Sequence, residues 1–194
     1  MNRTLIVTAI LAGAAFGASA QTVDSTVQRD VNQQNRIEQG MQNGTITTRE
    51  GAELERQEGA VDRLQQRELR DGTLSTQDAA RLKAAQNRVS GDISRANNNG
   101  VNGNPLSGSS QREQAEVQRN IQQENRIQAG VANGGLNNHE VSRLEGGQSR
   151  IDRSEYRAGE NGRVSQREEN RVDNRDNRNS YRIHKQRWDG QQRK

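Results

Sequence analysis

An internal duplication limits the folds that this 194-residue chain can adopt. Residues 27–93 align with residues 117–183 at a constant offset of 90 positions and without a gap. For example, Val27-Gln28-Arg29 matches Val117-Gln118-Arg119. Apolar residues in both copies recur three, four or seven positions apart, as they do in amphipathic helices. The sequence therefore predicts an all-α fold in which one three-helix unit occurs twice, either as two separate bundles or as one pseudo-symmetric assembly of six helices.

A short motif occurs twice in each unit, at residues 43–50, 71–78, 133–140 and 161–168. Each copy reads Asn or Asp, Gly, any residue, an aliphatic residue, a small hydroxyl or amide residue, two further residues and an acid. Glycine suits the left-handed residue that ends a helix. A hydroxyl or amide followed three positions later by an acid is a capping box. The motif thus predicts a turn followed by a new helix, with consecutive helices antiparallel.

The N-terminal residues have the features of a secretory signal peptide. A positive charge at Arg3 precedes the apolar run Leu5–Phe16, and Ala18-Ser19-Ala20 is a small-residue cleavage site. We expect cleavage after Ala20 and a periplasmic or secreted product. The apolar run is shorter than the roughly 20 residues that span a membrane, and the chain has no Cys to carry a lipid anchor. We therefore expect neither a transmembrane segment nor a lipid anchor.

The rest of the chain divides by composition. We expect residues 21–96 and 112–188 to be the two helical units, and residues 97–111, rich in Asn, Gly and Ser, to be a flexible linker between them. Residues 189–194 form a short basic tail. Hydrophobic residues make up only 28% of the sequence. This predicts a thin core and leaves homo-oligomerisation as a way to bury more apolar surface.

The motif resembles positions 5 to 12 of an EF-hand calcium loop. With the helical pattern, it makes the chain similar to small secreted bacterial helical repeat proteins with degenerate EF-hand-like motifs, a family of unknown function. The resemblance implies calcium as the one candidate cofactor. The oxygen ligands it implies are Asn43, Thr45, Thr47, Glu50, Asp71, Ser75, Asp78, Asn133, Asn137, Glu140, Asn161, Ser165 and Glu168. The chain departs from the EF-hand at loop positions 1 and 3, where for example Arg67 and Leu69 stand in place of carboxylates.

The helix starts also resemble a motif of small periplasmic chaperones. In Spy-like chaperones, Leu-Thr-x-x-Gln opens helices, and Leu74-Ser75-Thr76-Gln77-Asp78 is similar to it. An acid replaces the final Gln. This resemblance implies a chaperone that holds unfolded clients as a further alternative.

Groups suited to catalysis are scarce. The chain has no Cys and two histidines, His139 and His184, and it contains no His-Glu-x-x-His, phosphate-loop or serine-elbow sequence. His139 lies in a capping box, where it is expected to be an exposed first-turn residue. Charged residues make up 28% of the chain, so chance pairs of carboxylates are expected and none is singled out as an acid-base dyad. The sequence predicts that the protein is not an enzyme.

Positive charge is concentrated near the C-terminus, where residues 171–194 hold eight Lys or Arg residues against three Asp. The candidate polyanion-binding residues are Arg171, Arg175, Arg178, Arg182, Lys185 and Arg187. Such a segment suits anionic lipid headgroups, nucleic acid or an acidic protein face. The leading hypothesis is therefore a non-enzymatic exported helical protein that binds a macromolecular partner, either a protein or a polyanion. Calcium binding in the motif loops and a Spy-like chaperone are the alternatives.

Overall fold

The computed structural model describes residues 22–189, which form six α-helices and no strand. The prediction of an all-α fold is confirmed. The helices are α1 (Val23–Asn43), α2 (Thr48–Glu68), α3 (Thr76–Asn98), α4 (Gly108–Ala132), α5 (Asn138–Gly159) and α6 (Gln166–Arg187). Helices α1 to α3 come from the first sequence repeat and α4 to α6 from the second. The predicted signal peptide and residues 190–194 of the predicted basic tail lie outside the described residues.

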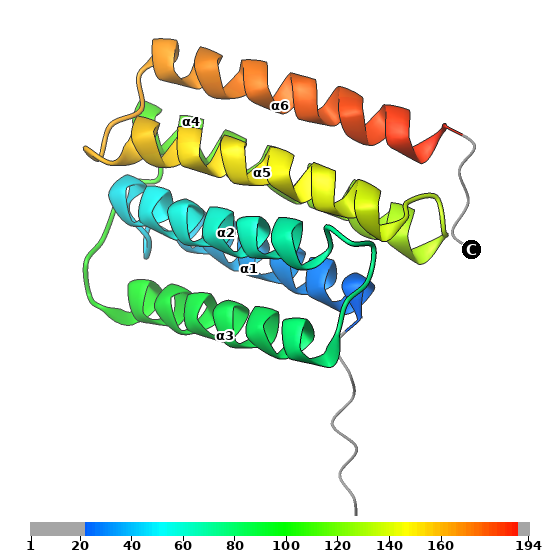
Figure 1. Ribbon diagram of the computed structural model, residues 1–194. Coiled ribbons are helices and arrows are strands. Elements are labelled where there is room, and N and C mark those ends of the chain that lie inside the picture. The colour runs from blue at the N-terminus through cyan, green and yellow to red at the C-terminus, as the bar shows by residue number, and fades with distance from the viewer. Residues whose placement is uncertain (1–21, 190–194) are drawn as a thin grey trace, which may run out of the picture.

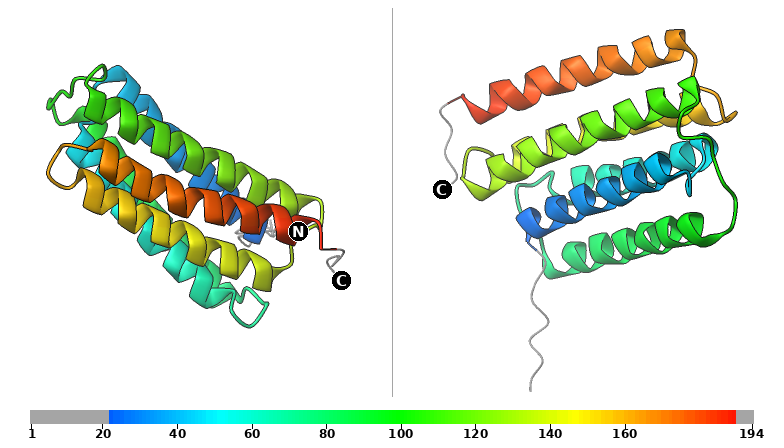
Figure 2. Two further views of the ribbon diagram at one scale, coloured as in Figure 1. Left: turned by 90° about the horizontal axis from the view of Figure 1, so that it is seen from above. Right: turned by 180° about the vertical axis from the view of Figure 1, so that it is seen from behind.

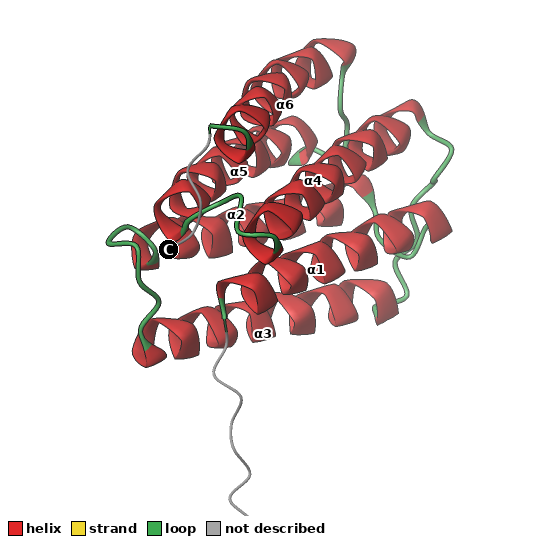
Figure 3. Ribbon diagram, turned by 90° about the vertical axis from the view of Figure 1, so that its right-hand side faces the viewer, coloured by secondary structure: helices red, strands yellow, loops and turns green. Residues whose placement is uncertain are grey.

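The helices lie in four layers (Figure 1). Helix α3 forms one outer layer and α6 the other, while α1 and α2 form one inner layer and α4 and α5 the next. The view from behind in Figure 2 and the side view in Figure 3 show the same order. The most extensive contacts join equivalent helices of the two repeats, α2 with α5 and α1 with α4. The repeats thus pack on each other as one pseudo-symmetric assembly, the second of the two predicted arrangements.

All four copies of the motif form the predicted turn. The glycine at the second motif position has a positive φ, between 75° and 84°, in every copy. The fifth motif residue accepts a hydrogen bond from the backbone N–H of the acid, and the acid accepts one from the backbone N–H of the fifth residue. This capping box begins α2 at Thr47, α3 at Ser75, α5 at Asn137 and α6 at Ser165.

The connection between the repeats lies within the predicted linker. Helix α3 ends at Asn98, and Ser107 is the N-cap of α4. The backbone N–H of Gly103 donates to the backbone oxygen of Gly44 at 2.8 Å. The connection is therefore attached to the first motif turn.

Apolar packing is divided among separate clusters. One cluster, around Ile37 and Leu54, joins helices α1 to α4. A second, around Ile127 and Leu144, joins α1, α4, α5 and α6. The remaining buried positions on the four inner helices are largely polar or charged. Among the described helices, none is both long and apolar enough for a membrane span.

Small residues allow α2 and α5 to approach closely. A Cβ atom at Gly59 of α2 would lie 2.9 Å from the Cβ of Asp152 on α5. A Cβ atom at Gly159 of α5 would lie 2.7 Å from the Cβ of Ala52 on α2. The hydroxyl of Ser149 donates to the backbone oxygen of Gly59 at 2.8 Å, across the same contact. The absence of a side chain at Gly59 therefore sets how near the two repeats lie.

Replacing Gly59 by Ala tests this contact. Gly91 in α3 is a matched control, because the nearest atom that its added Cβ would meet is the end of the Arg95 side chain at 3.7 Å. Alanine is favoured over glycine inside a helix by about 1 kcal/mol, so Gly91→Ala should raise the free energy of unfolding by up to about that amount. Gly59→Ala should instead lower it by roughly 1–3 kcal/mol through overpacking. Urea unfolding followed by circular dichroism measures both, and equal stabilisation by the two changes would contradict the close approach.

Candidate functional site

Nine exposed basic side chains line one groove between α5 and α6. Three neighbouring hollows, with volumes of about 450, 210 and 560 Å³, make up this groove and share lining residues Arg150, Arg157 and Arg175. We call it the basic groove. Its cationic residues are Arg143, Arg150, Arg153 and Arg157 from α5 and Arg171, Arg175, Arg178, Arg182 and Lys185 from α6.

The positive charges of the basic groove outnumber the two acids that line it, Glu168 and Asp189. Within residues 22–189, none of the nine has a carboxylate oxygen within 4.0 Å, whereas Arg56, Arg81 and Arg95 of the first repeat do. Partial burial, together with the charges of Arg182 and Arg175, lowers the pKa of Arg150. Mutual repulsion of this kind is relieved by a bound anion.

The structure brings together five of the six residues predicted to bind a polyanion. Arg187 does not line the groove, and its side chain lies against Gly130 of α4. The α5 arginines were not predicted, although Arg143, Arg150 and Arg157 recur every seven positions. That spacing places them on one face of a helix. Only the packing of α5 beside α6 brings the basic residues of the two helices together in one groove.

The predicted calcium ligands lie in the four turns, where hydrogen bonds engage them. The first motif residue accepts from the backbone N–H two positions later in three copies, at Asp71, Asn133 and Asn161. In the first copy, Glu50 accepts from the backbone N–H of Thr47 at 3.0 Å and from Asn99 at 2.6 Å. These contacts explain the motif as a cap and turn. Calcium binding in the loops stays a prediction.

Neither histidine is placed beside a catalytic group. The Nδ1 atom of His139 lies 2.9 Å from the backbone oxygen of Arg70, so the ring joins the second and third turns. The ring of His184 lies 6.5 Å from that of Trp188 near the end of α6.

The helices bury an unusual number of carboxylates, all but Asp176 of α6 on the four inner helices. Twelve Asp or Glu residues are buried, whereas no Lys or Arg of residues 22–189 is. The twelve are Asp30, Glu55, Glu58, Asp62, Glu113, Glu116, Glu124, Glu140, Glu145, Asp152, Glu155 and Asp176. A buried charge without a partner is costly, and the group usually changes its pKa or binds a cation instead.

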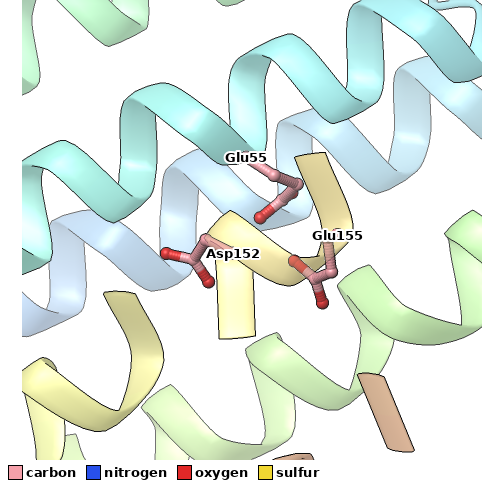
Figure 4. Close-up of side chains that lie close together, drawn as sticks. All are labelled: Glu55, Asp152 and Glu155. Atoms are coloured by element: carbon pink, nitrogen blue, oxygen red, sulfur yellow. The ribbon is translucent and has the colours of Figure 1, made fainter. Parts of the chain in front are cut away.

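Three of these acids form the first carboxylate cluster, shown in Figure 4. Glu55 comes from α2, and Asp152 and Glu155 come from successive turns of α5. One carboxylate oxygen of each lies within 4.8 Å of the other two. The amide of Gln34 donates to Glu55 at 2.9 Å, and that of Asn120 donates to Glu155 at 2.9 Å and to Glu55 at 3.3 Å.

The second carboxylate cluster consists of Asp62, Glu124 and Glu145, from α2, α4 and α5. One oxygen of each again lies within 4.8 Å of the other two. The offset of 90 relates this cluster to the first, because Asp62 is equivalent to Asp152 and Glu145 to Glu55. Duplication of the chain has thus produced two similar clusters, both at the contact between the repeats.

A third acidic group differs because it contains its own cation. Glu116, Asp173 and Asp176 lie close together, and Arg119 pairs with Glu116 at 2.9 Å and with Asp173 at 2.5 Å. Its charge is therefore partly balanced by an ion pair. The first and second clusters have no such cation among the described residues.

Burial raises the pKa values of the core carboxylates. It raises the pKa of Asp30 and of Glu55 to about 7, even though amide donors oppose the shift. The pKa values of Glu124 and Glu145 are raised well above their usual range, first by burial and then by the charges of neighbouring acids. In the absence of a bound cation, several of these groups therefore carry a proton near neutral pH.

The raised pKa values predict a stability that falls as pH rises. In the unfolded chain Asp30 and Glu55 titrate near pH 4, whereas in the folded chain their pKa is about 7. The folded state binds more protons between these values, so the stabilisation is complete below about pH 4 and is lost as pH rises to about 7. With chelator present, we expect the melting temperature to drop on the order of 10 °C between about pH 4.5 and 7.5.

A double variant provides the control for this pH dependence. Asp30→Asn with Glu55→Gln removes two of the titrating groups, so its melting temperature should change less over the same range. Differential scanning calorimetry measures both proteins. A wild-type melting temperature that rises with pH over this range would contradict the raised pKa values.

Comparisons with known proteins leave the resemblances found in the sequence as predictions. No family model matches the chain. No curated protein and no solved structure matches it either.

Proposed function

We propose that this protein is an exported, non-enzymatic helical protein that binds a polyanion in the basic groove. The observation that carries the proposal is the gathering of nine exposed cations from α5 and α6 without a carboxylate partner among the described residues. The prediction of a basic binding segment came from residues 171–194 alone, and α5 adds four cations to the five that α6 contributes to the groove.

The chemistry of the groove suits repeated anionic groups. Guanidinium groups bind phosphate, sulfate and carboxylate through two parallel hydrogen bonds. From Arg171 to Lys185 the groove follows α6 for 14 residues, which is about 20 Å at 1.5 Å per residue. A linear polyanion of that length presents several charges in a row. Small single anions would use only part of the groove.

Comparison of the two repeats shows that the basic groove carries more positive charge than its equivalent in the first repeat. The equivalent groove between α2 and α3 is lined by four arginines, Arg56, Arg67, Arg81 and Arg88, and at three other positions by Ala60, Ala85 and Asp92. At the equivalent positions the basic groove has Arg150, Arg175 and Arg182. The groove of the second repeat is therefore the more basic of the two. A requirement for solubility alone gives no reason for this difference.

The alternatives have less structural support. A protein partner with an acidic face would use the same groove, and the binding test below separates it from a linear polyanion. The Spy-like chaperone and calcium binding in the loops stay predictions, since no contact of the described residues favours them over helix capping.

Charge reversal at two equivalent pairs of positions tests the proposal. Arg157→Glu with Arg178→Glu changes the basic groove, and Arg67→Glu with Arg88→Glu makes the same change in charge at the equivalent exposed positions of the first repeat. Fluorescence anisotropy with labelled heparin and with a labelled single-stranded 20-nucleotide DNA measures affinity. We expect the first variant to bind at least about tenfold more weakly and the second to change less than about twofold.

Salt dependence gives a second measure of the same contacts. Binding that displaces counterions from several anionic groups weakens steeply as salt is raised. We expect wild-type affinity to fall at least about a hundredfold between roughly 50 and 200 mM salt, with a smaller slope for the basic-groove variant. Equal weakening by the two charge-reversal variants, or no binding to either probe at low salt, would count against the proposal.

A further inference from the structure

We infer that the core of this protein holds two divalent-cation sites, one in each carboxylate cluster, and that the second cluster is the tighter site. The cations that fit are those that prefer oxygen ligands, such as Ca²⁺ or Mn²⁺. This inference is independent of the basic groove, and it places the ions away from the motif loops.

The ligand geometry suits one cation in each cluster. Three carboxylate oxygens that lie within 4.8 Å of one another can share an ion at the Ca²⁺–oxygen distance of about 2.3–2.6 Å. Each cluster offers only oxygen atoms, because neither histidine is near it and the chain has no Cys. Oxygen ligands select hard cations over zinc or copper.

Buried oxygens without hydrogen-bond donors are a separate observation that points to an ion. Glu145 is completely buried, and neither of its carboxylate oxygens has a donor. Glu58 is 2% exposed, and both of its oxygens also lack a donor. One carboxylate oxygen of Glu124 also lacks a donor. Buried polar atoms normally have a hydrogen-bond partner, so the oxygens of Glu145 and Glu124 that lack donors within the second cluster indicate a missing positive charge.

Amide side chains beside the clusters also have oxygen atoms without hydrogen-bond donors. The carbonyl oxygens of Gln34, Gln65 and Asn120 are buried and have no donor. The amide nitrogens of Gln34 and Asn120 donate to the first cluster, which fixes both side chains at its edge. Gln65 donates to Asp30, the residue equivalent to Asn120. Amide oxygens are ordinary ligands of Ca²⁺.

The duplication relates the two sites position by position and also explains their difference. Where the first cluster has Gln34, whose amide donates to Glu55, the second has Glu124 facing Glu145. At this position the second cluster thus has a carboxylate in place of a hydrogen-bond donor. The reverse exchange, Gln65 for Glu155, leaves three carboxylates in each cluster. Neither oxygen of Glu145 has a donor, whereas Glu55 and Glu155 both accept from amides, so the second cluster favours a cation more strongly and is the tighter site.

Each site takes ligands from both repeats. The first combines Glu55 of α2 with Asp152 and Glu155 of α5, and the second combines Asp62 of α2 with Glu124 and Glu145 of the other repeat. The Asp62 and Asp152 side chains also bond to each other at the contact between the repeats. A cation at either site therefore bridges the two repeats and should stabilise their association.

The test uses the chain from residue 21 onward, unfolded with chelator and refolded in about 1 mM Ca²⁺, Mn²⁺ or Zn²⁺. Elemental analysis after gel filtration counts bound ions, and calorimetry gives the melting temperature. We expect two Ca²⁺ or Mn²⁺ ions per chain, a higher melting temperature than without metal, and fewer Zn²⁺ ions. No bound Ca²⁺ or Mn²⁺ in a folded wild-type protein would overturn the inference.

Equivalent substitutions separate the two sites from each other and from the loops. Glu145→Gln and Glu55→Gln should each leave one bound ion, with the weaker remaining affinity in Glu145→Gln, and the double variant should bind none. Each removes a buried charge without changing side-chain shape, so metal-free variants should melt no lower than metal-free wild type, which excludes misfolding as the cause. Asp78→Asn in the second turn should keep both ions. Retention of both ions by the double variant, or their loss in Asp78→Asn, would overturn the inference.

Discussion

The close contact between α2 and α5 determines how the two repeats face each other. The two helices are equivalent members of the duplicated unit, so their contact lies on the pseudo-twofold axis of the molecule. Ser149 bonds to Gly59 and Asp62 bonds to Asp152, and both pairs are separated by 90 residues. Only residues close to such an axis lie beside their own counterparts, as Gly59 and Ser149 do. Each other buried position is repeated once in each half of the core. An acid on that face therefore occurs in the core twice.

This arrangement makes the stability of the protein depend on what neutralises its core. The apolar clusters lie apart, and carboxylates and amides occupy much of the contact between the repeats. Ionised carboxylates in such a place oppose folding, whereas protons or cations remove the repulsion. The motif turns contribute in a different way, because their caps satisfy helix ends at the surface. The motif turns are thus independent of the charge in the core. The association of the two repeats depends on that charge.

The sequence predicted the parts of the fold that depend on neighbouring residues. Capping boxes and left-handed glycines act over fewer than eight positions, so Thr47 and Gly44 could be assigned their roles before the structure was known. Gly59 could not, because glycine inside a helix appears destabilising until the helix that packs on it is known. For the same reason, the sequence did not show that α5 contributes to the basic groove. Arg150 and Arg175 are 25 positions apart, and only tertiary packing places them in one hollow.

The carboxylate clusters were missed although the sequence contained a signal for them. With 28% charged residues, acids at helical spacing are ordinary, and a solvent-exposed stripe has the same period as a buried one. The signal was retention of acids at equivalent positions: Glu145 repeats Glu55 and Asp152 repeats Asp62. At the surface, by contrast, Ala60 is matched by Arg150 and Asp92 by Arg182. A duplicated chain thus contains an internal comparison of which positions differ and which stay the same.

Helix α5 connects the two features because its two faces have opposite chemistry. Its exposed face supplies Arg150 and Arg157 to the basic groove, and its buried face supplies Glu145 and Asp152 to the carboxylate clusters. Ionised acids beneath the groove weaken its positive potential, since Coulomb interactions extend further through a protein interior than through water. A cation or a proton in the core removes that opposing charge.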